Sequence, residues 1–387
     1  MLWICLATAL LSFTISVVLC DAVKRISLSR GLIDAAGTEA HKPAADTPIP
    51  NTGGVAVFWA VASPLAAVMT AVWAIPIDTW AQWSPTLAVH IPGLRDSTAV
   101  GAWLLAGLAV LHVTGLVDDR RALGAWPKLA VQLGVAGVLA TLGGMRVLSL
   151  LDGWGTAGSV LAVTLSVVWI VVVTNAMNFL DNMDGLAAGV GALAAALYLA
   201  ATLMAGQWFV AGLCALLMGA LLGFLIFNLP PARLYLGDGG SLVVGLLLAV
   251  IAIRTAYFQS EPTSDAARTD VYLPGAWYGL LMPLMVLAVP LYDFVSVVVI
   301  RAAKGQSPMT GDHNHFSHRL LRRGLTKRAA LAVILLATAA TGLSGVMLGR
   351  VPGWMAAVLG VQAAAVIAML ALLEFGGERH GDQSPST

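Results

Sequence analysis

Apolar stretches long enough to cross a lipid bilayer recur along most of this 387-residue chain. Hydrophobic residues make up 59% of the sequence and charged residues 11%, whereas about 25% charged residues is usual in soluble domains. A membrane helix needs about 20 apolar residues. Windows of that length predict about eleven spans, near residues 2–20, 55–76, 98–117, 128–145, 158–174, 186–205, 207–227, 241–258, 275–300, 329–349 and 353–373. The sequence therefore predicts an all-α, polytopic integral membrane protein.

Basic residues are distributed unevenly between the loops that join these windows. Residues 1–20 have neither the basic start nor the cleavage site of a signal peptide, so we take them as the first span. If the next loop is cytoplasmic, the other side of the membrane receives only five of the 21 Lys and Arg residues, namely Arg95, Arg146, Arg254, Arg268 and Arg350. Because cytoplasmic loops carry the excess of basic residues, we expect the amino terminus outside and the carboxyl terminus in the cytoplasm.

No segment between the predicted spans is long enough to fold as a separate soluble domain, so residues 1–387 are predicted to form one membrane-embedded domain. Three polar segments lie on its cytoplasmic side: the first loop, residues 21–54, a basic loop, residues 301–328, and a tail, residues 375–387. The first loop ends in a Pro- and Gly-rich stretch, which is typical of irregular backbone. The three Cys residues lie in apolar runs without metal-ligand spacing. Function is therefore expected in the spans and their cytoplasmic loops.

The most polar place inside the apolar sequence is the stretch Asn-Ala-Met-Asn-Phe-Leu-Asp-Asn-Met-Asp-Gly at residues 175–185. Acids and amides between two membrane-length apolar runs are costly, and they indicate a functional site. On a continuing helix, Asn178, Asp181 and Asn182 would project from one face. A face of oxygen atoms suits a hard cation or a polyhydroxyl ligand.

Two further acidic clusters fall on the same predicted side. Asp118 and Asp119 follow the third window, with Lys128 and Gln132 shortly after them. The pair could end and cap the span, or it could handle protons or a metal ion. Asp238 lies in a Gly-Asp-Gly-Gly turn before the eighth window, where the backbone can approach a ligand and a helix amino terminus favours phosphate. Such a turn could also be only a loop.

The basic loop contains His313, His315 and His318 beside Arg319 and further basic side chains. A zinc site is one interpretation, although it lacks an evident set of ligands. A surface for anionic lipid headgroups is another. We favour binding of a phosphate-bearing substrate, because His and Arg donate strong hydrogen bonds to phosphate.

Taken together and in order, these clusters resemble the motifs of the polyprenyl-phosphate N-acetylhexosamine-1-phosphate transferases. The resemblance covers most of the chain: residues 47–54 resemble the family's proline and double-glycine loop, Asp118 and Asp119 its aspartate pair, and residues 175–185 its central motif. Residues 236–241 resemble its magnesium turn, and His-Phe-Ser-His-Arg-Leu at 315–320 its terminal histidine motif. The chain departs from the pattern at Asn182, where Gly is usual, at Ser317, where a second His is usual, and at Ala45, where a loop histidine is usual.

The resemblance implies a Mg²⁺-dependent enzyme, with Mn²⁺ as an alternative metal, in the bacterial inner membrane. It would transfer N-acetylhexosamine 1-phosphate, and by its closer branch N-acetylglucosamine 1-phosphate, from a UDP-sugar to undecaprenyl or another polyprenyl phosphate. The implied roles are catalytic for Asp118 and Asp119 and metal-binding for Asn178 and Asp238. The implied substrate-binding residues are Lys42, Lys128, Asn175, Asp181, Asn182, Asp184, His315, His318 and Arg319.

Two other functions stay open at this point. The muramoyl-pentapeptide branch of the same family is one, although its terminal motif is richer in His. A transporter with acids at broken helices is the other, but carrier acids are expected near the midplane, and these lie at span ends on one side. The expected partners are the two substrates and the bilayer, with no nucleic acid, and a homodimer is left open.

Overall fold

The computed structural model describes residues 1–31, 49–256, 280–306 and 315–375, and within these residues all regular structure is helical. Two short 3₁₀ helices, Ser149–Trp154 and Leu348–Arg350, accompany the α-helices. The α-helices are α1 Leu2–Ser29, α2 Gly53–Ala74, α3 Ile77–Trp83, α4 Pro85–Ala88, α5 Ile91–Asp96, α6 Thr98–Asp118, α7 Ala125–Thr141, α8 Gly155–Leu180, α9 Leu186–Ala205, α10 Trp208–Asn228, α11 Asp238–Ala256, α12 Met282–Val286, α13 Ala288–Ala303, α14 Phe316–Arg322, α15 Lys327–Met347 and α16 Gly353–Phe375. The all-α prediction is confirmed for the described part of the chain.

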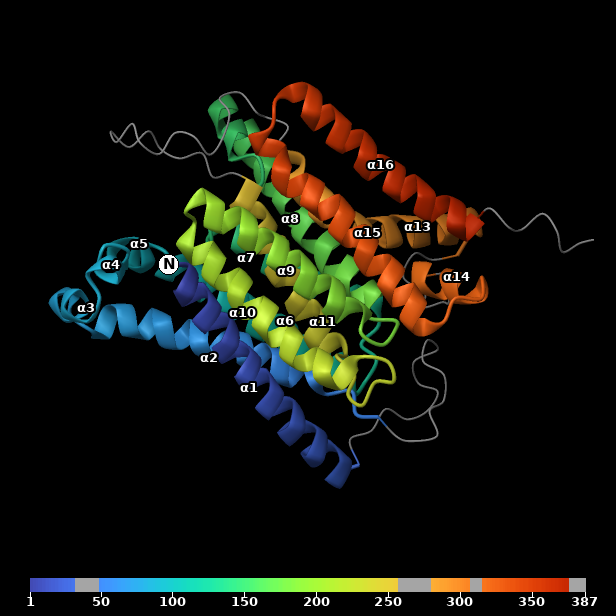
Figure 1. Ribbon diagram of the computed structural model, residues 1–387, viewed down its shortest axis with the longest axis horizontal. Helices are drawn as coiled ribbons and strands as arrows, with labels where there is room; N and C mark the ends of the chain where they lie inside the picture. The colour runs from blue at the N-terminus through green and yellow to red at the C-terminus, as the bar shows by residue number, and fades with distance from the viewer. Residues whose placement is uncertain (32–48, 257–279, 307–314, 376–387) are drawn as a thin grey trace, which may run out of the picture.

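Helix α11 lies inside the bundle and contacts α2, α6, α8, α9 and α10 (Figure 1). In its membrane-length window 89% of the residues are buried, against 17% for α16, which covers the outside. Its residues are apolar on every side, as expected for a helix surrounded by others. Because α11 contacts so many neighbours, its first residues can meet side chains from several other helices.

Small residues allow close helix contacts elsewhere in the bundle. At Gly219 of α10, an added Cβ would lie 2.1 Å from the carbonyl oxygen of Ala9, so α1 and α10 touch through their backbones. The hydroxyl of Ser16 donates to the carbonyl oxygen of Ala220 at 2.6 Å. Packing between small residues and such hydrogen bonds are the usual means of helix association in membranes.

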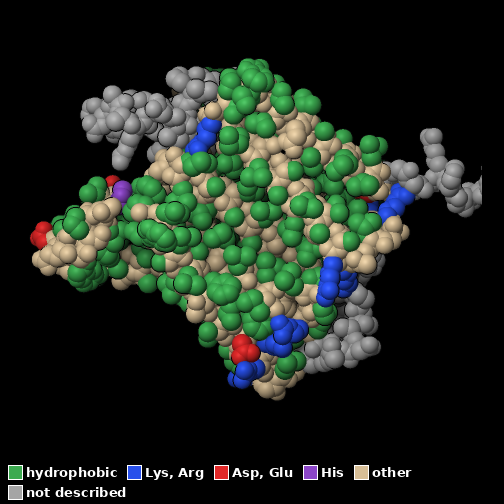
Figure 2. Space-filling model, in the orientation of Figure 1, with side chains coloured by type: hydrophobic (Ala, Val, Ile, Leu, Met, Phe, Trp, Pro, Cys, Tyr) green, Lys and Arg blue, Asp and Glu red, His purple; other side chains and the backbone are tan. Residues whose placement is uncertain are grey.

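Nine helices in the described ranges are long and apolar enough to cross a membrane, rather than the eleven predicted. The two windows that do not qualify are 128–145, where α7 has only 17 residues, and 275–300, where the helix is interrupted at Leu287 between α12 and α13. Pro283 and Pro290 lie on either side of this interruption, and proline inside a helix removes a hydrogen bond. The visible surface is broadly hydrophobic, and most of its Lys and Arg side chains lie towards one edge (Figure 2).

The first residues of α2 are joined to the loop before α11 by backbone hydrogen bonds. Gly53 N–H donates to the carbonyl of Tyr235 at 2.9 Å, and Gly54 N–H donates to that of Leu236 at 2.9 Å. A Cβ at Gly54 would lie 2.3 Å from the backbone nitrogen of Gly240. Glycine is therefore required for this approach, which brings the predicted proline and double-glycine loop to the amino end of α11.

Candidate active site

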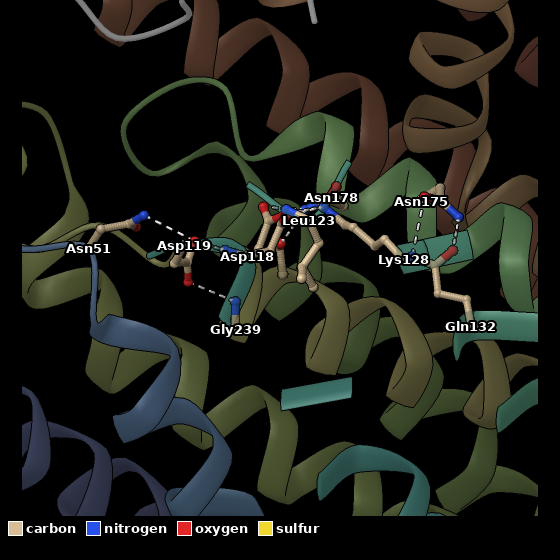
Figure 3. A network of polar contacts seen from close by, with 11 residues as sticks. Asn51, Asp118, Asp119, Leu123, Lys128, Gln132, Asn175, Asn178 and Gly239 are labelled. Carbon is tan, nitrogen blue, oxygen red and sulfur yellow. Dashed lines mark hydrogen bonds and ion pairs between the residues drawn. The ribbon is translucent and has the colours of Figure 1, made fainter. Parts of the chain in front are cut away.

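Four helix ends place the acidic motifs in one cluster (Figure 3). Asp118 and Asp119 end α6, Lys128 is in the first turn of α7, Asn178 is near the end of α8, and Asp238 begins α11. We call these five residues the aspartate cluster. The structure thus brings together the two predicted catalytic residues and the two predicted metal ligands.

Lys128 joins two of the acids. Its ammonium nitrogen lies 2.9 Å from Oδ2 of Asp118 and also forms an ion pair with Oδ2 of Asp238. These three side chains are between 15% and 21% exposed, so the cluster is sheltered but reachable. Two neighbouring carboxylates repel each other, and the ammonium between them offsets this repulsion. Lys128 was predicted to bind substrate, and its observed contacts are with these acids.

Asp119 has a different environment from its neighbour. Its Oδ1 accepts hydrogen bonds from the backbone N–H of Asp238 at 2.8 Å and from Nδ2 of Asn51 at 3.1 Å. Its Oδ2 accepts from the N–H of Gly239 at 3.1 Å. The first N–H groups of a helix have no partner within the helix, and a carboxylate there is also favoured by the helix dipole. Asp119 therefore caps α11.

Asn178 holds the Asp238 side chain from the opposite side. Its Nδ2 donates to Oδ1 of Asp238 at 2.7 Å and to Oγ of Ser241 at 2.8 Å. One turn earlier, Nδ2 of Asn175 donates to Oε1 of Gln132 on α7 at 2.6 Å. These amides fix the end of α8 relative to α7 and α11.

The donor set of the aspartate cluster fits a magnesium ion. Asp118 and Asp238 both direct an oxygen to the position of one cation, the Lys128 ammonium, and Asn178 adds an amide next to Asp238. Mg²⁺ takes one or two protein carboxylates and otherwise waters and substrate phosphates. Over the described ranges, no group of three or more His, Cys, Asp or Glu side chains is arranged to hold a metal. The cluster therefore presents two carboxylates at one cation position, which is within the number that Mg²⁺ takes from a protein.

The second half of the central motif leaves the helix. Because α8 ends at Leu180 and Asp181 is its C-cap, the prediction that Asn182 shares a helix face with Asn178 is wrong. Oδ1 of Asn182 instead accepts a hydrogen bond from the hydroxyl of Ser317 at the start of α14. This contact joins two of the three positions at which the chain departs from the family pattern.

Asp184 ties the central motif to two further segments. Its Oδ2 accepts a hydrogen bond from the backbone N–H of Ala232 at 3.3 Å. The same oxygen lies 3.4 Å from the ammonium nitrogen of Lys327, the first residue of α15. The observed contacts of Asp184 therefore hold the loop between α10 and α11.

His315 is held by an acid that the sequence analysis did not use. Nδ1 of His315 lies 3.1 Å from Oδ2 of Asp293, and Oδ1 of Asp293 accepts from the backbone N–H of Phe316 at 2.6 Å. Asp293 is fully buried in α13. An acid within an apolar window was the only signal that pointed to it. The His318 ring centre lies 6.5 Å from that of His315.

Arg319 is buried against the last helix. Its Nε lies 2.7 Å from Oε2 of Glu374 on α16, and another of its nitrogens donates to Oγ of Ser296 at 2.6 Å. The hydroxyl of Tyr292 bonds the other oxygen of Glu374. Arg319 therefore connects α14 to α13 and α16. Lys42 lies outside the described residues.

Comparisons with known proteins agree with this geometry. The model of glycosyl transferase family 4 matches residues 102–256, which contain the whole aspartate cluster. The chain is 33% identical over 362 residues to the decaprenyl-phosphate N-acetylglucosaminephosphotransferase of Mycolicibacterium smegmatis, covering 87% of this chain and 81% of that protein. It is 26% identical to the probable undecaprenyl-phosphate N-acetylglucosaminyl 1-phosphate transferase of Bacillus subtilis, covering 86% and 82%. It is 29% identical to the undecaprenyl-phosphate alpha-N-acetylglucosaminyl 1-phosphate transferase of Escherichia coli K12, covering 66% and 68%.

The buried pair of Arg319 and Glu374 yields a stability prediction. Glu374→Leu removes the carboxylate partner of a buried guanidinium, so we expect the free energy of unfolding to fall by about 3 kcal/mol. Arg319→Met combined with Glu374→Leu should recover much of that loss, because neither member of this ion pair is then left without its partner. Thermal or denaturant unfolding of the purified protein in detergent would measure both. A double variant as unstable as Glu374→Leu alone would contradict this account.

Proposed function

Because the chain belongs to the polyprenyl-phosphate N-acetylhexosamine-1-phosphate transferases of glycosyl transferase family 4, we propose that it transfers N-acetylglucosamine 1-phosphate from UDP-N-acetylglucosamine to undecaprenyl or another polyprenyl phosphate. UMP is released, and the polyprenyl-diphospho-sugar starts a cell-envelope polysaccharide. The observation that carries this proposal is the meeting of Asp118, Lys128 and Asp238 at the ends of α6, α7 and α11. Two relatives that match most of the chain are named for N-acetylglucosamine transfer, which disfavours the muramoyl-pentapeptide branch.

In the proposed reaction, an oxygen of the lipid phosphate forms a bond to the sugar-bearing phosphorus of the nucleotide. The bond between that phosphorus and the bridging oxygen breaks, and UMP leaves with the oxygen. Enzymes catalyse phosphoryl transfer mainly by positioning the groups and offsetting their negative charge. Lys128 supplies a positive charge to the site, and the helix ends around it hold the acids in place.

Magnesium, when bound, would offset the charge of the diphosphate, as metal ions do in phosphoryl transfer. Asp238 and Asn178 are the residues that we propose for holding it. Asp238 is suited to this role because Asn178 and Lys128 orient its two oxygens.

The acids of the aspartate pair take separate roles in this proposal. Asp119 already accepts three hydrogen bonds from Asn51 and the start of α11, so we assign it as a positioning residue. Asp118 accepts from the backbone N–H of Leu123 at 2.7 Å and faces Lys128. It remains the carboxylate able to orient the lipid phosphate or accept its proton.

The other predicted substrate residues are proposed to act from the edges of the site. Asn182 and Asp184 order the segments beside the cluster, and His315 is oriented by Asp293. Arg319 supports the histidine segment through Glu374. The remaining residues that we propose to contact substrate are Lys42, Asn175, Asp181 and His318.

We further propose that the chain crosses the membrane eleven times, with the aspartate cluster on the cytoplasmic face. The nine long helices are supplemented by α7 and by the pair α12 and α13. Two positions support α7 as a membrane crossing. Its first turn, with Lys128, lies beside the ends of α6 and α8, and its other end leads to the start of α8. The bias of basic residues supports the orientation.

The activity itself can be measured with purified protein in detergent. Given UDP-N-acetylglucosamine, undecaprenyl phosphate and Mg²⁺, the protein should release UMP and form one lipid-linked product, because the bond between the two phosphates is the one that breaks. UDP-N-acetylmuramoyl-pentapeptide should yield no product. Release of UDP in place of UMP would mean ordinary sugar transfer and would disprove the proposal.

The roles of Asp238 and Asp118 can be separated by titrating Mg²⁺ against activity. Asp238→Asn should raise the Mg²⁺ concentration needed for half-maximal activity, because it weakens one of few protein ligands. Asp118→Asn should lower kcat by roughly 10²-fold or more without changing that concentration. Asp152→Asn, the control, removes one carboxylate far from the cluster. It should change neither kcat nor the Mg²⁺ concentration needed for half-maximal activity. Rescue of Asp118→Asn by excess metal would reverse the two roles.

The orientation can be tested with single cysteines in intact cells. Asp96 and Arg233 are both exposed side chains, and the three native cysteines are buried. Asp96→Cys should react with a membrane-impermeant maleimide, whereas Arg233→Cys should react only after the cells are permeabilised. Labelling of Arg233→Cys from outside would overturn the proposed topology.

A further inference from the structure

A cavity of about 470 Å³ lies at the other end of the bundle from the aspartate cluster. Helix α11 begins at Asp238 and has Arg254 in its last turn, so the two are about 24 Å apart along the helix at 1.5 Å per residue. The cavity is bounded by α5, the segment after α7, the turn between α9 and α10 and the end of α11. The polar and aromatic residues in its wall include His90, Ser97, Arg146, Gln207, Trp208 and Arg254.

Gln207 is the unusual residue in this wall. It is 6% exposed, and neither atom of its side-chain amide has a hydrogen-bond partner in the described chain. Its backbone is fixed, because its N–H donates to the carbonyl of Thr202 at 2.9 Å and its carbonyl accepts from Ala211 at 2.8 Å. Buried amides are almost always paired. An unpaired amide at a cavity wall indicates that a polar ligand or a water molecule supplies its hydrogen-bond partners.

The charged side chains that line the cavity are of one sign. Its wall, as far as the chain is described, contains two arginines and a histidine but no Asp or Glu. Arg146 shares its charge with Asp152, 3.3 Å away. Arg254 makes no hydrogen bond or ion pair with the described residues. Two of the five basic residues that the sequence assigns to this side of the membrane therefore lie at a single cavity.

A simpler explanation covers only part of this arrangement. A cation in the last turn of a helix complements the helix dipole, and a long basic side chain can extend to the membrane interface. These effects account for the position of Arg254. They do not explain the unpaired amide of Gln207 or the collection of Arg146 and Arg254 at one cavity.

We propose that this cavity binds a phosphoryl anion, supplied either by the headgroup of an anionic phospholipid or by free phosphate. Arginine donors match the oxygen atoms of phosphate, and the Gln207 amide can donate a further hydrogen bond. Trp208 in the wall, whose ring centre is 5.7 Å from that of His90, is a residue typical of the headgroup level of a bilayer. The site is separate from the proposed reaction and does not depend on it.

The test uses the full-length protein in detergent and two readouts. Native mass spectrometry measures the affinity for phosphatidylglycerol and phosphatidylcholine, and thermal unfolding measures stabilisation by each lipid and by inorganic phosphate. Arg254→Gln should weaken binding of the stabilising anion about tenfold, since one charge-assisted hydrogen bond is lost. Gln207→Leu should also weaken binding of the anion. The substitution should not lower the Tm of the ligand-free protein, because it removes an unpaired buried amide.

Arg95→Gln is the matched control. It removes one positive charge at the same end of the bundle, but Arg95 donates to the carbonyl of Val72 at 2.6 Å and does not line the cavity. Binding should be unchanged in this variant. Stabilisation by phosphatidylglycerol alone would identify a lipid headgroup as the ligand, and stabilisation by inorganic phosphate would identify the free anion. The proposal would be overturned if Arg254→Gln bound the anion as tightly as the unaltered protein, or if Arg95→Gln weakened binding as much as Arg254→Gln. It would also be overturned if neither anion stabilised the protein.

Discussion

The carboxylate of Asp119 links the amino end of the buried helix α11 to the rest of the site. Inside a membrane protein, the first N–H groups of such a helix need partners, because lipid supplies none. Asp119 accepts from Asp238 and Gly239, and Asn51 adds a third hydrogen bond to the same carboxylate. Gly237, at φ 70°, turns the chain into α11, and a Cβ there would lie 2.7 Å from Oδ2 of Asp119. The cap thereby fixes the direction of the Asp238 side chain.

The same close packing explains why a cation lies among the acids. A Cβ at Gly115 would lie 2.4 Å from the backbone of Asp238, so α6 and α11 touch just below their acidic ends. This contact brings Asp118 and Asp238 together, and two adjacent carboxylates strongly disfavour each other's charge. Lys128 contacts both carboxylates and offsets that repulsion. We infer that the geometry that brings these carboxylates together also requires a lysine on α7.

The sequence predicted the helical class and the residues of the aspartate cluster, because long apolar runs and acids at their ends are local signals. It did not predict where α8 ends, because residue spacing alone placed Asn182 on the same helix face as Asn178. The contact of Asn182 with Ser317 was not predictable either, because the two residues are 135 positions apart in the sequence. Glu374 was missed for a similar reason: nothing near residue 374 in the sequence indicates a partner 55 residues earlier. The interruption at Leu287 was also missed, because average hydropathy over a window does not register the prolines within it.

The two ends of α11 carry opposite arrangements of charge, and each follows from how the end of the helix is satisfied. At the amino end, carboxylates complement the free N–H groups and leave Asp238 directed at Lys128. At the carboxyl end, Arg254 complements the dipole but makes no ion pair within the described chain. The amino end of this buried helix therefore lies among acids and a lysine, whereas its carboxyl end lies at a cavity lined by two arginines. Because such acids lie at the helix end and not at its midplane, the arrangement suits chemistry on a headgroup phosphate better than passage of an ion through the bundle.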